Sequence, residues 1–158
     1  MSEASNSILI RRAVSADAND IASCVKAAYE HYIVRMGKPP GPMLDDYDEV
    51  VKSHHVTVAE HEGEIVGALV LISLEDGVLL DNVAVLPTFQ GKGLGKRLMQ
   101  LAEDEVKSRG YSEIQLYTHE KMTENIAMYT NMGYVEVSRR VVNGYDRVYM
   151  SKQLGASS

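Results

Sequence analysis

The sequence has one cysteine and no tryptophan, and these shortages already restrict what the chain can be. With Cys24 alone, no internal disulfide can form, and a zinc site built on cysteine pairs is not expected. No apolar run approaches the roughly 18 residues that a membrane-spanning helix needs, and Met1–Ser7 lacks the apolar segment of a secretory signal. The sequence therefore predicts a cytoplasmic protein with no membrane-spanning segment.

Positive charge is also in short supply. Lysine and arginine together number 16 against 22 aspartates and glutamates, so the formal net charge is −6 at pH 7. A nucleic-acid-binding surface needs a basic excess, so nucleic acid is not an expected partner, whereas a cationic small substrate is weakly favoured. None of the histidine spacings is typical of metal ligands, so no metal is predicted.

The chain shows no internal repeat, low-complexity tract or interdomain linker. Its longest turn-rich stretch, Gly37–Pro42, is too short to separate domains. Hydrophobic residues make up 45% of the sequence, which is enough for a sizeable core in one domain of ordinary size. We therefore predict one domain at residues 6–154, with frayed ends at 1–5 and 155–158.

Hydrophobic periodicity predicts a mixture of strands and helices. Strands are expected at Ile8–Ala13, His55–Glu60, Glu64–Leu74, Val78–Val85, Ser112–Thr118, Tyr134–Val142 and Tyr145–Lys152. Helices are expected at Ser15–Met36, Asp45–Ser53, Leu94–Arg109 and Thr123–Met132, with Thr123 as the N-cap of the last. Hairpin turns are expected at 61–63, 75–77 and 143–144. This order predicts a mixed sheet with helices on its faces, an α/β fold of the α+β sandwich type.

The most informative segment is glycine-rich and lies between a predicted strand and a predicted helix. Residues 90–96 read QGKGLGK and open the helix at Leu94–Arg109. Glycines at alternate positions let a ligand approach the backbone closely, because no Cβ stands in the way. The free N–H groups at a helix N-terminus carry partial positive charge, so the segment predicts an anion site.

Three cations crowd the start of the same helix. Lys92, Lys96 and Arg97 all precede its first acid, although the helix dipole disfavours positive charge there by roughly 0.3–1 kcal/mol each. A bound polyanion explains their position, and a solvated basic face is the plainer alternative. A Walker A loop does not fit, because Gln90 stands where its first glycine belongs. A dinucleotide-binding fingerprint does not fit either, because Lys96 takes its third glycine position.

This segment resembles the signature of the GNAT superfamily of N-acetyltransferases. The family pattern R/Q-x-x-G-x-G/A is matched by Gln90, Gly93 and Gly95. Residues 82–87, which read NVAVLP, are also similar to the strand and exit that precede the signature in this family.

A second family pattern follows in the expected order. The downstream pattern N-x-x-x-Y-x-x-x-G-F/Y is matched by Asn125, Tyr129, Gly133 and Tyr134. The resemblance extends over about Ile8–Leu154 and is strongest at 78–134. It implies a GNAT-like fold with a mostly antiparallel twisted sheet of about seven strands and helices on both faces.

The resemblance also implies acetyl-coenzyme A as the cosubstrate and assigns residues to it. Its pyrophosphate would be held by the backbone of Gln90, Gly91, Lys92, Gly93, Leu94, Gly95 and Lys96. Its pantetheine arm would pair with the strand Val83, Ala84 and Val85, as an added strand does. A main-chain N–H near Val85 would polarise the thioester carbonyl. Asn125 would contact the cofactor arm, and Tyr129 would protonate the leaving thiolate.

An amine must lose a proton before it attacks a thioester, so a general base is needed. Asp81 is one candidate, and its alternative role is a solvated or hydrogen-bonded strand residue. His119, just past a predicted strand, has a suitable pKa, and its alternative role is an ordinary surface-loop histidine. Glu120 is a further candidate for the base, with the same alternative role as His119. Tyr129 has its own alternative as a core aromatic residue.

The acceptor amine is not identified by the sequence and could belong to a small molecule, a peptide or a protein. Similar proteins often wall the acceptor site with the region that here holds Tyr29, Tyr32, Arg35 and the loop Gly37–Tyr47. Asp45 and its neighbouring acids could attract an ammonium group, but we favour a solvated helix start for them. The family resemblance allows a homodimer, which no residue pattern demonstrates.

Two other functions share part of this pattern. A non-catalytic acyl-coenzyme A sensor would need the anion site but no acid or base, and an acyltransferase could use another acyl-coenzyme A. Transfer of an acetyl group to a primary amine accounts for both the anion site and Tyr129. The sequence therefore favours an acetyl-coenzyme A-dependent N-acetyltransferase.

Overall fold

The computed structural model describes residues 7–155, whose strands form one sheet. The strands are β1 (Leu9–Arg12), β2 (His55–His61), β3 (Glu64–Leu74), β4 (Gly77–Val85), β5 (Glu113–His119), β6 (Val135–Val142) and β7 (Tyr145–Gln153). They lie in the order β1-β2-β3-β4-β5-β7-β6, and every neighbouring pair is antiparallel except β4 and β5. The mixed, mostly antiparallel sheet of seven strands is therefore confirmed.

Each predicted strand is confirmed to within a residue at both ends. The turn between β2 and β3 has φ of 51° at Glu62 and 81° at Gly63, and the turn between β6 and β7 has 52° at Asn143 and 82° at Gly144. Left-handed backbone at both central residues is the type I′ arrangement, whose twist matches that of paired antiparallel strands. These two turns therefore set the register of their hairpins.

The helices depart from the sequence prediction at one place. They are η1 (Ser15–Asp17), α2 (Ala18–Tyr29), α3 (Tyr32–Met36), η2 (Gly41–Leu44), α4 (Tyr47–Ser53), η3 (Pro87–Phe89), α5 (Leu94–Ser108) and α6 (Thr123–Asn131), where η marks a 3-10 turn. The single helix expected at Ser15–Met36 is wrong, because the chain turns after α2. There the Ile33 N–H donates to the Glu30 carbonyl at 3.1 Å, which is the i→i−3 bond of a tighter helix.

A contact between distant parts of the chain explains the break between α2 and α3. Arg35 of α3 donates from both guanidinium Nη atoms to the two carboxylate oxygens of Glu124 on α6, and also to the Lys121 carbonyl. This bidentate pairing holds α3 over the start of α6. Local hydrophobic periodicity carries no information about such a partner.

The prediction that Thr123 caps α6 is also wrong. Helix α6 begins at Thr123, Met122 takes the N-cap position, and no side chain caps the helix. The Thr123 hydroxyl donates to Glu124 Oε1 at 3.3 Å instead. The predicted stop at Gly133 is confirmed, since this glycine has φ of 100° just past the helix.

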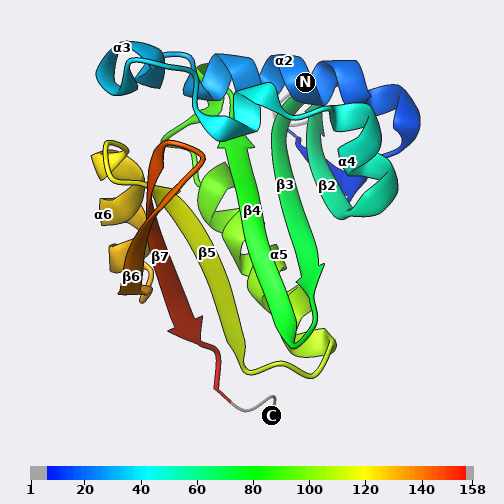
Figure 1. The fold of residues 1–158 in the computed structure, drawn as a ribbon. Coiled ribbons are helices and arrows are strands. Elements are labelled where there is room, and N and C mark those ends of the chain that lie inside the picture. Colours follow the sequence, from blue (N-terminus) through cyan, green and yellow to red (C-terminus); the bar gives the residue numbers. More distant parts are fainter. Residues whose placement is uncertain (1–6, 156–158) are drawn as a thin grey trace.

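Helices cover both faces of the sheet, as predicted (Figure 1). On one face, Leu98 and Val106 of α5 pack with Leu116 of β5 in a buried core cluster. On the other face, Ile21 of α2 packs with Val58 of β2 in a second cluster. The sheet is therefore the middle layer between two apolar cores.

Strands β4 and β5 separate along their length. They are bridged at Leu79–Gln115 and Leu80–Leu116, close to the N-terminal end of β4. Figure 1 shows their C-terminal ends diverging beyond these pairs, so that the sheet opens between them. Backbone groups on the facing edges of β4 and β5 thereby lose a neighbouring strand.

A β-bulge lies at the point where β4 begins to diverge. Leu71 of β3 pairs with Leu80 and Val70 pairs with Asn82, so Asp81 is the extra residue without a partner on β3. A bulge bends its strand and re-aims the local side chains. The bulge therefore places Asp81 at the base of the opening.

Some predictions concern residues that the structure does not describe. Of the frayed ends expected at 1–5 and 155–158, all residues but 155 lie outside the described range, as does residue 6 of the predicted domain. Within residues 7–155, no helix is both long enough and apolar enough to cross a bilayer. The same range holds no group of three or more His, Cys, Asp or Glu side chains that could bind a metal ion.

A buried acid ties α5 to the far edge of the sheet. Glu103 is 6% exposed, and its carboxylate accepts hydrogen bonds from Tyr134 Oη at 2.9 Å and from Lys152 Nζ at 3.1 Å. The Tyr134 ring lies 5.9 Å from that of Tyr129, centroid to centroid. The Glu103 pairings therefore help to position α6 as well as α5.

Replacing Lys152 with alanine is expected to lower the free energy of unfolding by about 1–3 kcal/mol, because a buried carboxylate loses its cationic partner. Urea unfolding at pH 7 measures the change. Lys26→Ala, which alters an exposed lysine on α2, is the matched control and should leave the stability near that of the wild type. Equal stability of the two variants would contradict this role of the Glu103–Lys152 pair.

Candidate active site

The glycine-rich segment forms an open turn ahead of α5. Gly91 and Gly93 have φ of 79° and 85°, values in the left-handed region that favours glycine. A Cβ built at either position meets no atom within 4 Å, so the space over the turn is open to a ligand. The first intrahelical bond runs from the Arg97 N–H to the Gly93 carbonyl at 3.0 Å. The N–H groups from Gly91 to Lys96 are therefore free to bind an anion, whereas the Gln90 N–H donates to the Pro87 carbonyl at 3.3 Å, and the first turn holds no acid.

The three predicted cations do not share one position. Lys96 lines the cleft over the turn, whereas the Lys92 ammonium lies over the Phe89 ring at 5.4 Å. Arg97 is exposed and does not line the cleft. In the described part of the chain none of the three forms an ion pair. The backbone of the turn and Lys96 are therefore the groups available to an anion in this cleft.

Strand β4 supplies the second wall of this cleft. The Leu86 N–H donates to the Val66 carbonyl of β3 at 2.9 Å, and backbone groups alternate between the two sides of a strand. Val83 and Val85 therefore direct their N–H groups to the opposite side, where β5 has diverged. The Val83 carbonyl on that side accepts a hydrogen bond from Tyr29 Oη at 2.8 Å. An extended ligand can pair with this edge of β4 as a strand would.

Three residues predicted to bind the cofactor make contacts within the protein instead, Gln90 and Leu94 through their side chains and Ala84 through its backbone. Gln90 donates from Nε2 to the Val85 carbonyl at 3.0 Å, so its side chain braces the turn against β4. Leu94 is 4% exposed and belongs to the core cluster under α5. Ala84 lines the cleft, but by the same alternation its backbone groups face β3.

The cleft has a volume of about 400 Å³ and runs from the turn toward α6. Its walls include Tyr29, Val85, Gly91, Gly93, Lys96 and Asn125. A second cavity of about 450 Å³ lies on the other side of the β4–β5 opening. The two volumes share the residues Tyr29, Val83 and Asn125, so they meet at the divergence of the strands.

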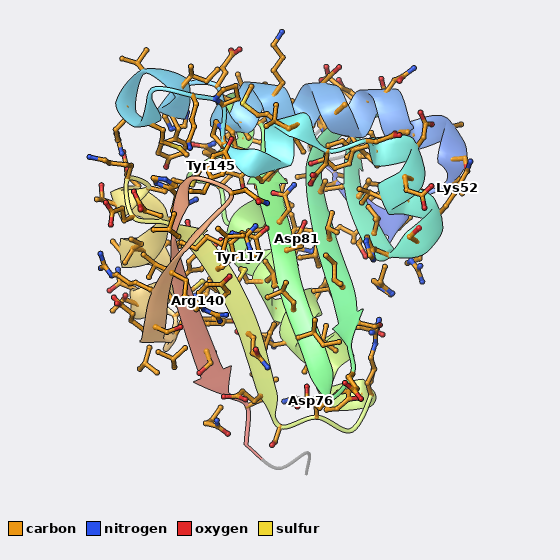
Figure 2. The ribbon with its side chains drawn as sticks, in the orientation of Figure 1. Lys52, Asp76, Asp81, Tyr117, Arg140 and Tyr145 are labelled. Atoms are coloured by element: carbon orange, nitrogen blue, oxygen red, sulfur yellow. The ribbon has the colours of Figure 1, made fainter. Side chains whose placement is uncertain are left out.

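Asp81 lies in the second cavity and is hydrogen-bonded across the opening. Its Oδ1 accepts from Tyr117 Oη of β5 at 3.0 Å. Figure 2 shows these two side chains on neighbouring strands, in the middle of the sheet. Burial raises the pKa of Asp81 above its ordinary value, although the Tyr117 hydrogen bond and the charges of His54 and Arg147 oppose this effect. A carboxylate with a raised pKa is a stronger base than usual.

Tyr129 is a core aromatic residue, one of the two roles predicted for it, and its role as proton donor stays a prediction. It is 4% exposed and packs in the core, yet it also lines the second cavity. Among residues 7–155 its hydroxyl has no hydrogen-bond partner, and no buried polar side-chain atom there is unpaired, so the hydroxyl must open onto the cavity. Burial raises the pKa of Tyr129, so the phenol stays protonated near neutral pH and can donate a proton.

His119 is not the surface-loop residue considered above. It is the last residue of β5, is 8% exposed and lines the second cavity. Its Nδ1 lies 3.0 Å from the Lys121 N–H and accepts from it, so the neutral ring carries its proton on Nε2. Burial lowers the pKa of His119, which favours that neutral form. The free ring nitrogen is then a hydrogen-bond donor, which does not suit a general base.

A buried hydrogen-bond network behind β4 was missed by the sequence analysis. Asn82 is 3% exposed, accepts from Tyr29 Oη at 2.9 Å and donates from Nδ2 to Tyr47 Oη at 3.1 Å. Tyr47 in turn donates to the Pro42 carbonyl at 2.7 Å. The network ties β4 to α2 and to the loop before α4. The available signal was an asparagine at an inward position of a strand that is otherwise apolar there.

The second cavity has a roof made by contacts between its two sides. Tyr145 donates from Oη to the Pro39 carbonyl at 2.6 Å, and Lys38 donates from Nζ to the Gly144 carbonyl. These bonds join the loop after α3 to the β6–β7 turn, and Figure 2 shows Tyr145 at that turn beneath α3. Asp45 is exposed, as expected, and it also borders this cavity, where partial desolvation and the nearby Asp81 raise its pKa.

A glycine turn at a helix start, beside an opening between two parallel strands, defines an acyltransferase site of the kind that the sequence resembles. A family model described as the acetyltransferase (GNAT) family matches residues 22–134, which is most of the chain. The chain belongs to this family and is an acyltransferase. The predicted family is therefore confirmed.

Individual proteins show how far the similarity extends. The chain is 29% identical over 143 residues to the uncharacterized N-acetyltransferase YjgM of Escherichia coli (strain K12), which covers 85% of this chain and 86% of that protein. It is 33% identical over 73 residues, 46% of the chain and 49% of the relative, to the ribosomal protein bS18-alanine N-acetyltransferase of Salmonella typhimurium.

Solved structures share the fold. The PaiA N-acetyltransferase from Thermoplasma acidophilum, in complex with coenzyme A, superposes with a TM-score of 0.77 at 19% identity, over 93% of this chain and 99% of that one. The ribosomal-protein-S18-alanine N-acetyltransferase from Escherichia coli gives a TM-score of 0.71 at 18% identity, over 96% and 97% of the two chains. Both confirm the predicted fold class.

Gly93→Asp is expected to abolish measurable coenzyme A binding, because a carboxylate would stand in the open space over the turn, against the pyrophosphate. Isothermal titration with coenzyme A measures the affinity. Gly93→Asn is the matched control, since it adds the same bulk at the same left-handed position without charge. Binding by Gly93→Asp within about tenfold of Gly93→Asn, roughly 1.4 kcal/mol, would contradict the anion site.

Proposed function

We propose that the protein transfers the acetyl group of acetyl-coenzyme A to a primary amine by direct attack. The observation that carries this proposal is the meeting of the cleft and the second cavity at the β4–β5 opening. One volume reaches the anion-binding turn, the other holds Asp81 and Tyr129, and a thioester placed at their junction is accessible from both. A sensor that only binds acyl-coenzyme A would not need the second cavity.

The residues of the cleft suit a long anionic cosubstrate. The amides of the turn Gly91–Lys96 bind the pyrophosphate, and the Val85 N–H pairs with the pantetheine arm. The Val83 N–H, which lies at the junction of the two volumes, stabilises negative charge on the thioester oxygen during attack. Asn125, which lines both volumes, contacts the arm near its reactive end.

The chemistry assigns one proton transfer to each side of the opening. The amine nitrogen attacks the acetyl carbonyl carbon, a C–N bond forms and the C–S bond breaks. The proton lost by the nitrogen passes to Asp81, directly or through a water molecule, and Tyr129 donates its proton to the leaving thiolate. The products are an N-acetylated amine and coenzyme A with a free thiol.

Asp81 suits the base better than the other candidates do. His119 uses Nδ1 to accept from the Lys121 N–H, so its remaining nitrogen is protonated in the neutral ring. Glu120 is half-buried and lies within 3.6 Å of the Arg139 guanidinium in an ion pair. Asp81 has a raised pKa and faces the cavity where the amine must bind.

Two measurements test the proposal as a whole. Isothermal titration with acetyl-coenzyme A is expected to show binding, and a thiol reagent is expected to show coenzyme A release when primary amines are added. No binding by folded protein at millimolar acetyl-coenzyme A would refute the cosubstrate. Faster turnover with propionyl- or succinyl-coenzyme A would replace acetyl by another acyl group.

Tyr129→Phe is expected to lower kcat by about a hundredfold, because the leaving thiolate loses its proton donor. Binding of acetyl-coenzyme A should change little, since the ring remains in place. Tyr111→Phe, at a partly buried tyrosine outside both cavities, is the control and should keep wild-type turnover. Unchanged kcat in Tyr129→Phe would remove this residue from the mechanism.

Asp81→Asn is expected to lower kcat at pH 7 by about a hundredfold, because the base is lost. In the wild type, kcat should fall as the pH drops through the pKa of Asp81, because protonation removes the base. Since that pKa is raised, the acidic limb should lie above the ordinary value of 3.8. The limb should be absent in Asp81→Asn.

Asp76→Asn supplies the control for this experiment. Asp76 is exposed in the β3–β4 turn, which Figure 2 places at the N-terminal end of β4, far from the opening. This variant should keep both the rate and the limb of the wild type. An acidic limb that persists in Asp81→Asn would assign the titration to another group.

A further inference from the structure

The second cavity carries opposite charges on the two sides of one tyrosine. Tyr117 donates from Oη to Asp81 at 3.0 Å, and the Arg147 guanidinium lies over the Tyr117 ring, with Cζ 3.9 Å from the ring centroid. Asp81 and Arg147 both line the cavity. An anionic and a cationic group thus lie against the same phenol side chain and line the same cavity.

The Arg147 guanidinium has N–H donors that form no hydrogen bond with the described residues. In the described part of the chain its guanidinium forms no ion pair, and Nη1 donates to Tyr149 Oη at 3.2 Å. A guanidinium has five N–H donors in a rigid fork that matches a carboxylate. Stacking on Tyr117 fixes the orientation of this fork, so little side-chain entropy would be lost on binding an anion.

A second arginine adds positive charge at the same place. Arg140 of β6 is directly opposite Arg147 of β7 in the sheet register, and its guanidinium lies over the Tyr149 ring at 4.1 Å. Like charges directly opposite each other destabilise a strand pair. Residues 7–155 provide neither arginine with a carboxylate partner in an ion pair. An anion bound at Arg147 would offset this repulsion.

The cavity also limits the size and polarity of its ligand. Its volume is about 450 Å³, and the bonds from Tyr145 to the Pro39 carbonyl and from Lys38 to the Gly144 carbonyl join two of its walls on one side. Apolar side chains such as Leu44, Ile72 and Leu80 make up much of the remaining wall. A cavity of this volume with a partly apolar wall suits a small molecule with an apolar body.

We infer that the acceptor in the proposed acetyl transfer is a small zwitterion, a primary amine that carries a carboxylate and an apolar body. Asp81 receives the amino group at the opening, and the Arg147 fork binds the carboxylate. This assignment rests on the proposed function, and it adds Arg147 as the residue that determines acceptor specificity. The carboxylate takes no part in bond making or breaking.

Matched acceptors test the inference. Coenzyme A release by the full-length protein is measured with acetyl-coenzyme A and with L-leucine, L-methionine and L-phenylalanine, each against its own carboxamide. The acids should have kcat/KM about ten- to a hundredfold above the amides, because only they accept charge-assisted hydrogen bonds from Arg147. The carboxamides have the less basic amino groups, so a larger fraction of them is unprotonated and ready to attack. This effect alone would favour the carboxamides, which is opposite to the expected result.

The variant Arg147→Gln should raise KM for the acids by about ten- to a hundredfold, whereas KM for the amides, which have no carboxylate, should change much less. Arg147→Lys keeps the charge without the fork and should recover part of the loss. Arg139→Gln is the control, because Arg139 pairs with Glu136 outside the cavity. A merely structural role of Arg147 would lower acid and amide turnover together.

The outcomes separate the inference from the proposal beneath it. Equal or faster turnover of the amides overturns the zwitterion, as does an equal loss for acids and amides in Arg147→Gln. Acetyl-coenzyme A binding without turnover of any of the three acids also overturns it. Folded protein that does not bind acetyl-coenzyme A refutes the proposed function itself, and the inference with it.

Discussion

The divergence of β4 from β5 is the constraint on which the site depends. Two bridged residue pairs hold the strands together at one end, and the bulge at Asp81 bends β4 away from its neighbour. Backbone N–H groups that would pair in a continuous sheet are then available to a ligand. The same opening connects the cleft over the glycine turn with the cavity that holds Tyr129, so binding and chemistry share one structural cause.

Buried polar groups hold this opening in shape. Asn82 links Tyr29 and Tyr47 from behind β4, and the Tyr29 hydroxyl also reaches the Val83 carbonyl on the open side. On the other side Glu103 fixes α5 through Tyr134, whose ring packs against Tyr129. Within residues 7–155 no buried polar side-chain atom is left without a partner. Networks of this kind stabilise one geometry strongly because a broken bond leaves a buried group unpaired.

Most of the wall of the second cavity lies inside the segment that the family model matches, and a smaller part lies beyond it. The family model ends at residue 134, whereas Tyr145 and Arg147 lie beyond it on β7. The opposite wall comes from the loop after α3, which is tied to the β6–β7 turn. Relatives that share the fold at 18–19% identity can therefore keep the cleft and still differ in the molecule that enters the second cavity.

The sequence by itself determined the strands, the I′ turns, the glycine turn and the family, because each depends on residues close together in the chain. Only the tertiary structure decided the break after α2, the burial of His119 and the contacts that Asp81 and Arg147 both make with Tyr117. The physical reason is sequence separation: the Asp81–Tyr117 bond joins residues 36 apart, the Arg35–Glu124 pair 89 apart and the Tyr145–Pro39 bond 106 apart. Periodicity and turn chemistry act over a few residues, whereas these contacts exist only once the sheet has brought its edges together.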